Sequence, residues 1–292
     1  MDQYFKSYEE FDVHHLMLSD NARVLAYKTA IFNCKEKFQD KIVMDVGAGS
    51  GILSIFCAQA GAKKIYAVEA SMLARTIEQV LVENNVQNKV EVIHCKVEDI
   101  CPSNVEKVDI IVSEWMGFYL VHEGMLDSVL YARDNFLRED GLLFPSVAKL
   151  YASPCQLPSM YEFWDDVYGV SMRCIGKEYR KVKSEKPEIL LLNRNDLLAE
   201  DGSELSTGPC NEATHWKQTA IVLPTDIEVL QHQPVAFKLT FEKDALNSRC
   251  YNIKLILLDA EEIEHDIPCN CHMTKCIVTK TYIESQSNEE SV

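Results

Sequence analysis

Two glutamates nine residues apart are the side chains whose types and spacing most directly suggest chemistry. Glu114 and Glu123 lie in SEWMGFYLVHEGM (113–125), which the pattern predicts to be a hairpin-like loop after an apolar run. Two convergent carboxylates suit a planar guanidinium, because bidentate pairing fixes its plane and orientation. Ordinary surface glutamates are the alternative, but large apolar neighbours are unusual in a solvated loop. These neighbours are Trp115, Met116, Phe118, Tyr119 and Met125.

A glycine-rich loop in VMDVGAGSGIL (43–53) is the second candidate site. Gly47, Gly49 and Gly51 follow an apolar run and open a helical pattern, so the backbone can turn tightly and a ligand can approach it. Glu69 lies 20 residues after Gly49, at the end of the next apolar run, where an acidic side chain accepts hydrogen bonds from ribose hydroxyls. Alternatively, the glycines form only a strand–helix turn and Glu69 caps a helix.

The details of this loop favour one ligand class. Dinucleotide sites prefer G-x-G-x-x-G with a helix N-terminus facing the pyrophosphate, whereas here the third glycine comes one residue early. Asp45 precedes the loop, and its carboxylate would repel a pyrophosphate but would suit a cationic amino group and a sulfonium. The loop therefore predicts S-adenosylmethionine. Glu98 would then accept from the adenine amino group, or it is a plain surface glutamate.

Strand-like and helical runs that alternate along the first half position both candidate sites. A parallel, doubly wound α/β sheet follows from this alternation. The apolar runs span 42–46, 64–70, 90–100 and 108–115, and the helical patterns span 51–62 and 70–85. A helix over 22–37 precedes them, with Asp20 at its N-cap position. Ligands of such sheets bind at the carboxyl ends of the strands, where the glycine loop and Glu114 both lie.

After Pro145 the pattern becomes alternating, which predicts antiparallel strands with one buried face over 235–243, 251–259 and 275–285. A charged stretch over 176–205 separates the two regimes. Within it, ILLLN (189–193) is the only strand-like run, and the basic run KEYRKVK (177–183) is interpreted as a solvated helix face.

Three motifs in order resemble the protein arginine N-methyltransferase family: VMDVGAGSGIL, SEWMG with Glu123, and THWKQ (214–218). The opening YFKSYEEFDVHHLMLSDNAR is also similar. The resemblance implies a Rossmann-like S-adenosylmethionine domain followed by an antiparallel β-barrel-like domain with a helical dimerisation arm. The expected divisions are cofactor-covering helices over 1–37, the Rossmann-like domain over 38–145, the barrel-like domain over 146–285 with its arm around 155–205, and a disordered tail over 286–292.

The resemblance also implies residue roles. Glu114 and Glu123 would clamp the substrate arginine, and His215 would pair with Asp20 beside them. Tyr8 and Trp216 would contact substrate, Tyr8 also covering the cofactor. The residues that would bind the cofactor are Tyr4, Phe5, Met17, Arg23, Asp45, Gly47, Gly49, Glu69, Val97, Glu98 and Met125. Without the resemblance, Asp20 is interpreted only as an N-cap, Arg23 as solvated, His215 as a satisfied histidine, and Met17 and Met125 as core.

The implied activity is methyl transfer from S-adenosylmethionine to arginine in histone tails or Arg/Gly-rich proteins, giving mono- and asymmetric dimethylarginine and S-adenosylhomocysteine. Met17 and Met125 match two methionines that crowd the site in asymmetric-dimethylating members. However, only 92 residues separate Glu123 from His215, where the family carries additional barrel strands. Missing strands would expose unpaired edges, so we expect reduced stability and impaired activity. The alternatives are a cofactor-binding scaffold that dimerises with an active relative, and a small-molecule methyltransferase.

Composition sets limits on the partners. The chain has 292 residues, and 29 Lys+Arg against 45 Asp+Glu give a net charge of −16, which disfavours nucleic acid and favours basic partners. The acidic, aromatic N-terminus does not resemble a secretory signal, and no apolar run approaches the roughly 20 residues of a membrane span. Eleven cysteines without a disulfide framework predict reduced thiols in cytoplasm and nucleus.

The segment CNCHMTKC (269–276) carries four residues of metal-ligating type. They are Cys269, Cys271, His272 and Cys276. The C-x-C-H spacing lacks the usual C-x₂₋₄-C with a second half-site, so no metal is predicted, and the cysteines are interpreted as reduced thiols at a β-rich surface.

Overall fold

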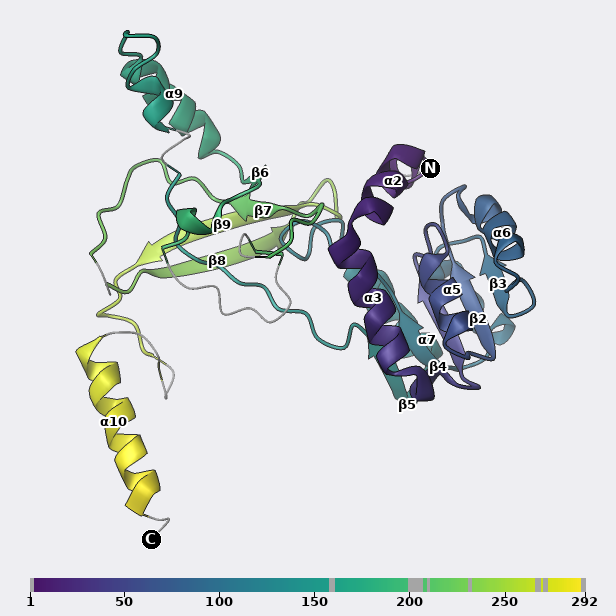
Figure 1. Ribbon diagram of the computed structural model, residues 1–292. Coiled ribbons are helices and arrows are strands. Elements are labelled where there is room, and N and C mark those ends of the chain that lie inside the picture. Colours follow the sequence, from purple (N-terminus) through teal and green to yellow (C-terminus); the bar gives the residue numbers. More distant parts are fainter. Residues whose placement is uncertain are drawn as a thin grey trace.

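A five-stranded parallel sheet forms the first half of the chain (Figure 1). The computed structural model describes residues 3–157, 161–198, 207–208, 211–230, 233–265, 269 and 273–289. The strand order is β3-β2-β1-β4-β5, so the doubly wound prediction is confirmed and the order reverses at β1. The strands are β1 Ile42–Val46, β2 Lys64–Val68, β3 Val90–Ile93, β4 Val108–Val112 and β5 Leu137–Phe144. Sequence pattern missed β5, whose LREDG start is polar.

Helices cover both faces of this sheet. β1 is buried along its whole length, as a central parallel strand must be when both of its faces are covered. One buried cluster joins β1 through Val43 to α3, α5 and α6, and the other joins it through Met44 to α7. The helices of this half are α1 Gln3–Ser7, α2 Phe11–Ser19, α3 Asn21–Asn33, α4 Lys35–Phe38, α5 Ile52–Gln59, α6 Ala74–Glu83, η1 Val97–Asp99, η2 Pro102–Asn104 and α7 Met125–Phe136.

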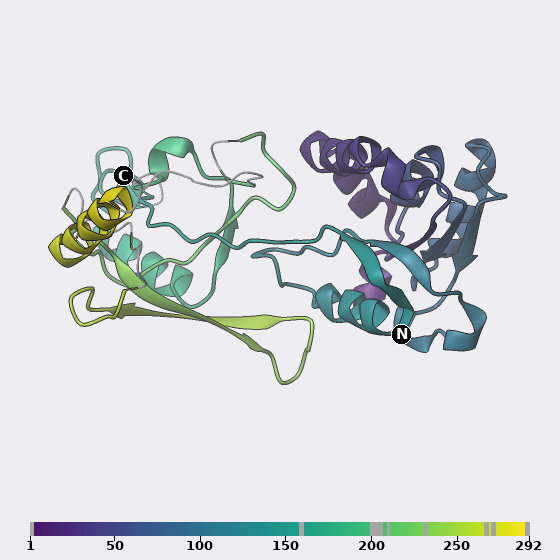
Figure 2. The ribbon, with the colours of Figure 1, turned by 90° about the horizontal axis from the view of Figure 1, so that it is seen from below.

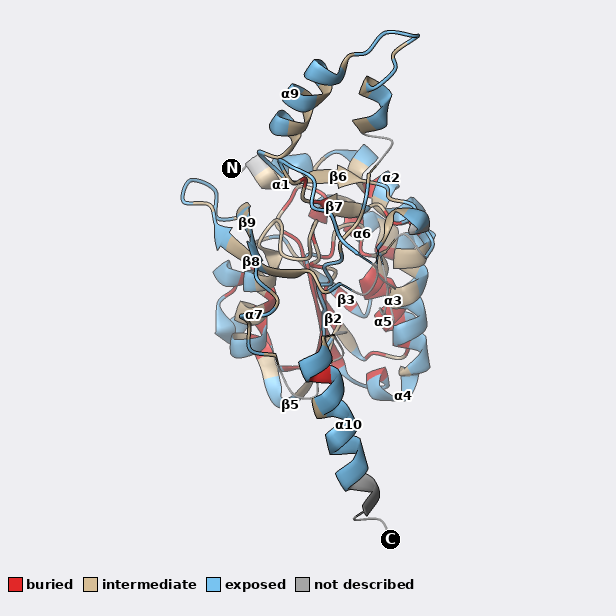
Figure 3. Cartoon of the chain, turned by 90° about the vertical axis from the view of Figure 1, so that its left-hand side faces the viewer, coloured by how far each residue is buried: buried red, intermediate tan, exposed pale blue. Residues whose placement is uncertain are grey.

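The second half is antiparallel but, within the described residues, does not close a barrel. Its strands form two separate ladders: β6 Glu188–Leu190 pairs with β7 Gln218–Ala220, and β8 Ala236–Lys243 pairs with β9 Tyr251–Leu258. The run ILLLN therefore supplies a strand that pairs next to the THW segment. Figure 2 shows this half beside the first, joined by an extended connection. The charged stretch forms most of α9 Arg173–Lys183, which projects outward with η3 Glu162–Trp164 packed against it (Figures 1 and 3). The turn η4 Arg194–Asp196 follows β6.

Three local expectations are wrong. Residues 275–285 form part of helix α10, Thr274–Glu289, which also includes residues 286–289 of the expected disordered tail. No strand pairs with this segment among the described residues, and as a helix it satisfies its backbone groups internally. The third strand ends at Ile93, so Glu98 lies in the short η1 turn instead of on a strand.

Cys271 and His272 lie outside the described residues. Across the described ranges, every helix is too short or too polar to span a bilayer.

Candidate active site

A cavity of about 270 Å³ lies at the carboxyl ends of β1, β2 and β4. It collects side chains from the N-terminal helices, the glycine loop, the segment after β4, the THW segment and the β8–β9 hairpin. Asp20 and Asp45 are the two predicted site residues that do not line it. The predicted residues that do are Tyr4, Phe5, Tyr8, Met17, Arg23, Gly47, Gly49, Glu69, Val97, Glu98, Glu114, Glu123, Met125, His215 and Trp216.

The glycine loop turns tightly because two of its glycines adopt backbone angles that other amino-acid types rarely adopt. Gly47 has φ +75° and Gly49 has φ +54°, both in the left-handed region. The N–H groups of Gly47 and Ala48 both donate to the carbonyl of Val68, at 2.9 Å, which ties the loop to the end of β2. A Cβ atom at Gly47 would lie 2.4 Å from Met125 Cε. The loop is therefore open toward the cavity and closely packed beside Met125.

Glu69 is buried at the end of β2 and faces the same loop. Its Oε2 accepts from the Gly49 N–H at 2.8 Å, and its Oε1 accepts from the Ser71 N–H at 2.7 Å. A carboxylate offers about four acceptor positions, so roughly two remain for hydroxyl donors in the cavity. Glu69 thus supports its local turn and also keeps the acceptor capacity that the ribose role requires.

Asp45 lies beneath the loop and not in the cavity. Its side chain is fully buried, Ser54 Oγ donates to Oδ2 at 2.7 Å, and Oδ1 has no hydrogen-bond partner among the described residues. Burial raises the pKa of Asp45 to about 7, against the lowering effect of Ser54 and with a further increase from Glu69. Asp45 would therefore influence a cationic ligand only through the glycine loop and not by the predicted direct contact.

Asp45→Asn is expected to change how stability depends on pH. The unfolded chain loses the Asp45 proton near pH 3.8, whereas the folded protein keeps it up to about pH 7. The free energy of unfolding therefore falls as pH rises between these two values. At about 1.4 kcal/mol per pKa unit, the wild type should lose about 2 to 3 kcal/mol more than the variant between about pH 5 and pH 8. Urea unfolding at both pH values measures this, and parallel losses would contradict it.

The clamp loop, residues 113–124, carries the two candidate glutamates. It begins where β4 ends, and Ser113 Oγ donates to the Val46 carbonyl at 2.8 Å. Gly117 and Leu120 exchange N–H···O hydrogen bonds at 3.1 Å, which confirms the hairpin-like prediction. A Cβ atom at Gly117 would lie 2.3 Å from the His122 carbonyl oxygen, so the turn requires glycine. Glu123 has φ +75°, which directs its backbone out of the turn.

Glu114 forms an ion pair with Arg23. Arg23 Nε and Nη2 both donate to Glu114 Oε2, at 2.8 and 2.5 Å, and the two side chains are only 12% and 9% exposed. Arg23 Nη1 also donates to the Met17 carbonyl at 2.9 Å, while Glu114 Oε1 accepts from the Met116 N–H at 3.2 Å. The arginine expected to bind a cofactor carboxylate therefore also orients one clamp glutamate.

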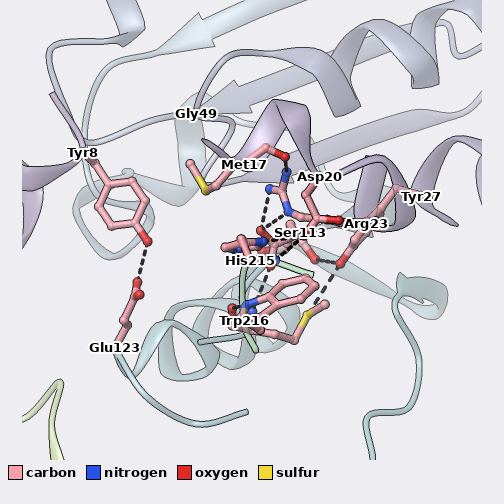
Figure 4. A network of polar contacts seen from close by, with 12 residues as sticks. Tyr8, Met17, Asp20, Arg23, Tyr27, Gly49, Ser113, Glu123, His215 and Trp216 are labelled. Atoms are coloured by element: carbon pink, nitrogen blue, oxygen red, sulfur yellow. Dashed lines mark hydrogen bonds and ion pairs between the residues drawn. The ribbon is translucent and has the colours of Figure 1, made fainter. Parts of the chain in front are cut away.

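Glu123 is held from the opposite side. Tyr8 Oη donates to Glu123 Oε2 at 2.6 Å, and Figure 4 shows this pair across an open space from Asp20, Arg23 and His215. The Glu123 N–H donates to the Arg249 carbonyl at 2.7 Å, and Arg249 Nη1 donates to the Glu123 carbonyl at 3.0 Å. The Arg249 guanidinium also lies 3.9 Å from the Tyr4 ring centroid. Sequence reasoning missed Arg249, because nothing in DALNSRCYN (244–252) distinguishes this arginine from a surface residue.

Asp20 links the THW segment to the start of α3. It accepts from the Arg23 N–H at 3.0 Å as the predicted N-cap, and from the His215 N–H at 2.8 Å. His215 Nδ1 lies 2.7 Å from Asp20 Oδ2, so the predicted pair is present. Burial raises the pKa of Asp20, but the hydrogen bonds from Arg23 and His215 outweigh this effect and hold it below the ordinary value. Ionised Asp20 places the His215 proton on Nδ1 and leaves Nε2 as an acceptor.

The remaining residues define the rim and the far end of the cavity. Trp216 Nε1 donates to the Met116 carbonyl at 2.7 Å, which joins the THW segment to the clamp loop. Glu98 is exposed and accepts from Ser128 Oγ at 2.6 Å, beside buried Val97. His14 is a buried cavity residue that sequence reasoning missed, with Nε2 2.8 Å from the Tyr8 carbonyl oxygen. The sequence feature that could have identified His14 is its position in the segment expected to cover the cofactor.

Comparison with known proteins decides the family. The Probable protein arginine N-methyltransferase 6.1 of Oryza sativa subsp. indica is 34% identical, with 86% of this chain and 86% of that protein covered. The Protein arginine N-methyltransferase 1 of Caenorhabditis elegans is also 34% identical, with 87% of each covered. This chain belongs to the protein arginine N-methyltransferase family. Members of the family are S-adenosylmethionine-dependent enzymes.

Family profiles and solved structures agree with this assignment. Residues 30–123 match the profile described as Ribosomal protein L11 methyltransferase (PrmA), and residues 196–258 match the Arginine methyltransferase oligomerization subdomain. The Trypanosoma brucei PRMT1 enzyme–prozyme heterotetrameric complex with AdoHcy has a chain with a TM-score of 0.72 at 27% identity, covering 89% of this chain and 98% of that one. Arabidopsis thaliana protein arginine methyltransferase 10 has a TM-score of 0.73 at 29% identity, covering 86% and 94%.

The comparisons also bear on the length of this chain. The alignment with the rice relative runs over 330 positions, more than the 292 residues of this chain. The relative therefore has residues at positions where this chain has none.

Proposed function

We propose that this chain transfers methyl groups from S-adenosylmethionine to the guanidino nitrogens of arginine in basic proteins, such as histone tails or Arg/Gly-rich proteins. The observation that carries the proposal is the arrangement of the clamp loop. Glu114 and Glu123 enter one cavity from the two ends of the loop, and the glycine loop lines the same cavity. Two carboxylates there match the two edges of a planar guanidinium cation.

The residues present fit S-adenosylmethionine. The left-handed Gly47 and Gly49 keep side chains away from the ligand, and Glu69 has acceptor positions left for ribose hydroxyls. Val97 and Glu98 would line the adenine end, beneath Tyr4 and Phe5. When bound, this cofactor supplies an electrophilic methyl group on a sulfonium.

The chain's own groups would make the arginine reactive. A guanidinium has a pKa above about 12 and is a poor nucleophile, because its lone pairs are delocalised. Glu114 and Glu123 would localise positive charge on the nitrogens they contact and leave the third nitrogen more nucleophilic. Orientation supplies much of the remaining acceleration. The His215 side chain, paired with Asp20, or a glutamate would accept the proton that the product loses.

The proposed product is asymmetric dimethylarginine, with the monomethyl form as its precursor. Met17 and Met125 both line the cavity, and Met125 Cε packs against the glycine loop. Two bulky thioether side chains would restrict the orientation of a monomethylated arginine. The net charge of −16 fits basic substrates. We further propose a homodimer formed through the segment around α9, where Phe163, Ile175 and Val182 are exposed, and a location in cytoplasm and nucleus.

The test is incubation with labelled S-adenosylmethionine and either histones or an Arg/Gly-rich protein, followed by separation of the methylarginine isomers. Incorporation as mono- and asymmetric dimethylarginine is the expected result. Symmetric dimethylarginine would overturn the product assignment. Cofactor binding without incorporation would overturn the activity and favour a scaffold that pairs with an active relative.

A further inference from the structure

A histidine and two cysteines converge beside the start of α10, a helix at the end of the second half away from the parallel sheet (Figure 2). Cys269 Sγ lies 3.3 Å from His265 Nδ1, and Cys276 Sγ lies 3.2 Å from the same nitrogen. The three atoms all lie within 4.8 Å of one another. His265 follows the β8–β9 hairpin and Cys276 lies in the first turn of α10, so the cluster joins the segment after β9 to that helix.

The distances match a tetrahedral zinc site. With sulfur at about 2.3 Å and nitrogen at about 2.0 Å from zinc, neighbouring nitrogen and sulfur ligands lie about 3.5 Å apart and two sulfurs about 3.8 Å apart. Hydrogen bonding explains the arrangement less well. One lone pair on Nδ1 accepts one good hydrogen bond, whereas two sulfurs lie at nearly equal distance from it.

The second nitrogen of His265 is oriented as in metal sites. Nε2 lies 3.2 Å from the Ala260 carbonyl oxygen and can only donate to it. In the neutral ring this contact places the proton on Nε2, so that Nδ1 faces the two sulfurs as an acceptor. Donation of the other ring N–H to a backbone carbonyl is the usual support of a metal-bound histidine.

The cluster also explains how α10 is held to the rest of the protein. Cys276 is the only buried residue among those from 274 to 286, and Ile277, Val278 and Tyr282 are at least half exposed (Figure 3). Lys275 Nζ donates to the carbonyls of Glu261 and Ile263, at 3.1 Å each. With so little apolar burial, a metal link would supply stability that packing does not.

We propose that His265, Cys269 and Cys276 bind a structural Zn²⁺ ion that fastens α10 to the segment after β9. Two thiolates and an imidazole favour zinc over the harder Mg²⁺ and Ca²⁺. Glu261, Glu262 and Glu264 line the adjoining recess of about 560 Å³ and make it favourable for a cation. Binding Zn²⁺ to two thiols and one neutral imidazole releases two protons to solvent. The unusual spacing of CNCHMTKC conceals the site, because His265 lies outside that segment.

Metal content of the full-length protein tests the proposal. Protein purified without chelators should contain about one Zn²⁺ per chain. Replacing the metal with Co²⁺ should produce thiolate-to-cobalt charge-transfer absorption and the d–d bands of tetrahedral coordination. Cys276→Ser and His265→Ala should each lose the metal and these bands, while Cys174→Ser, which removes an exposed cysteine elsewhere, should retain both.

A second measurement reports on α10 directly. Chelation of the metal should reduce amide hydrogen-exchange protection in α10 and leave protection of the parallel sheet unchanged. Metal-free protein that shows no cobalt spectrum on titration would overturn the proposal, as would a Cys269–Cys276 disulfide found in freshly purified protein. These readouts do not depend on methyl transfer, so the zinc site and the proposed activity succeed or fail separately.

Discussion

Glu123→Gln should lower the rate of methyl transfer by about 10²- to 10³-fold, the loss typical of removing one group that stabilises charge in a transition state. Glutamine has nearly the same shape, and its amide oxygen can still accept from Tyr8 Oη. The backbone hydrogen bonds between Glu123 and Arg249 do not involve the side chain. The variant therefore removes one negative charge from the clamp and preserves its position.

The measurement pairs single-turnover transfer rates with cofactor affinity from calorimetry. Affinity for S-adenosylmethionine should remain unchanged, since the proposed cofactor contacts lie at the glycine loop and Glu69. Glu139→Gln, an exposed glutamate in β5, is the matched control and should leave both quantities unaltered. A transfer rate in Glu123→Gln equal to the wild type would show that the clamp assignment is wrong.

Arg23→Ala should lower the free energy of unfolding by about 3 kcal/mol, because it leaves the largely buried Glu114 carboxylate without its cationic partner. The same change frees the Glu114 side chain to rotate, so transfer should also fall. Arg23→Lys keeps the charge but has a single nitrogen, so it cannot reproduce the paired donation from Nε and Nη2 and should show an intermediate loss.

Urea unfolding of a double-mutant cycle identifies the cause. If the penalty arises from the unpaired Glu114 charge, Arg23→Ala combined with Glu114→Gln should be more stable than the sum of the two single changes predicts. Strict additivity would mean that Arg23 stabilises the fold through its contact with Met17 or through packing, and that the ion pair contributes nothing measurable.

The second half of the chain contributes to the site although its described strands do not close a barrel. The β8–β9 hairpin brings Arg249 against the clamp loop, where it hydrogen-bonds both backbone groups of Glu123. The THW segment also reaches the site. His215 pairs with Asp20, and Trp216 Nε1 donates to the Met116 carbonyl. Both contacts that the clamp needs from this half are therefore present without a closed barrel among the described residues.

Much of the first half could be predicted from local pattern. The apolar run IVMDV is β1 to the residue, and the glycine loop lies at its end, because a buried parallel strand and a left-handed turn impose composition on a few consecutive positions. Helix α10 shows the limit of the same reasoning. Residues 275–285 alternate like a strand, but strand formation needs a partner edge, which no local pattern supplies.

The sequence by itself determined the glycine loop, the order of the strands and helices around it, and the residue types of the clamp loop. Each of these depends on neighbours within a few positions. Only the tertiary structure decided the pairing of Arg23 with Glu114, the burial of Asp45 beneath the loop and the approach of Arg249 to Glu123. These contacts join segments whose distance in space is set by how whole elements pack, and the spacing of residues along the chain carries no record of that packing.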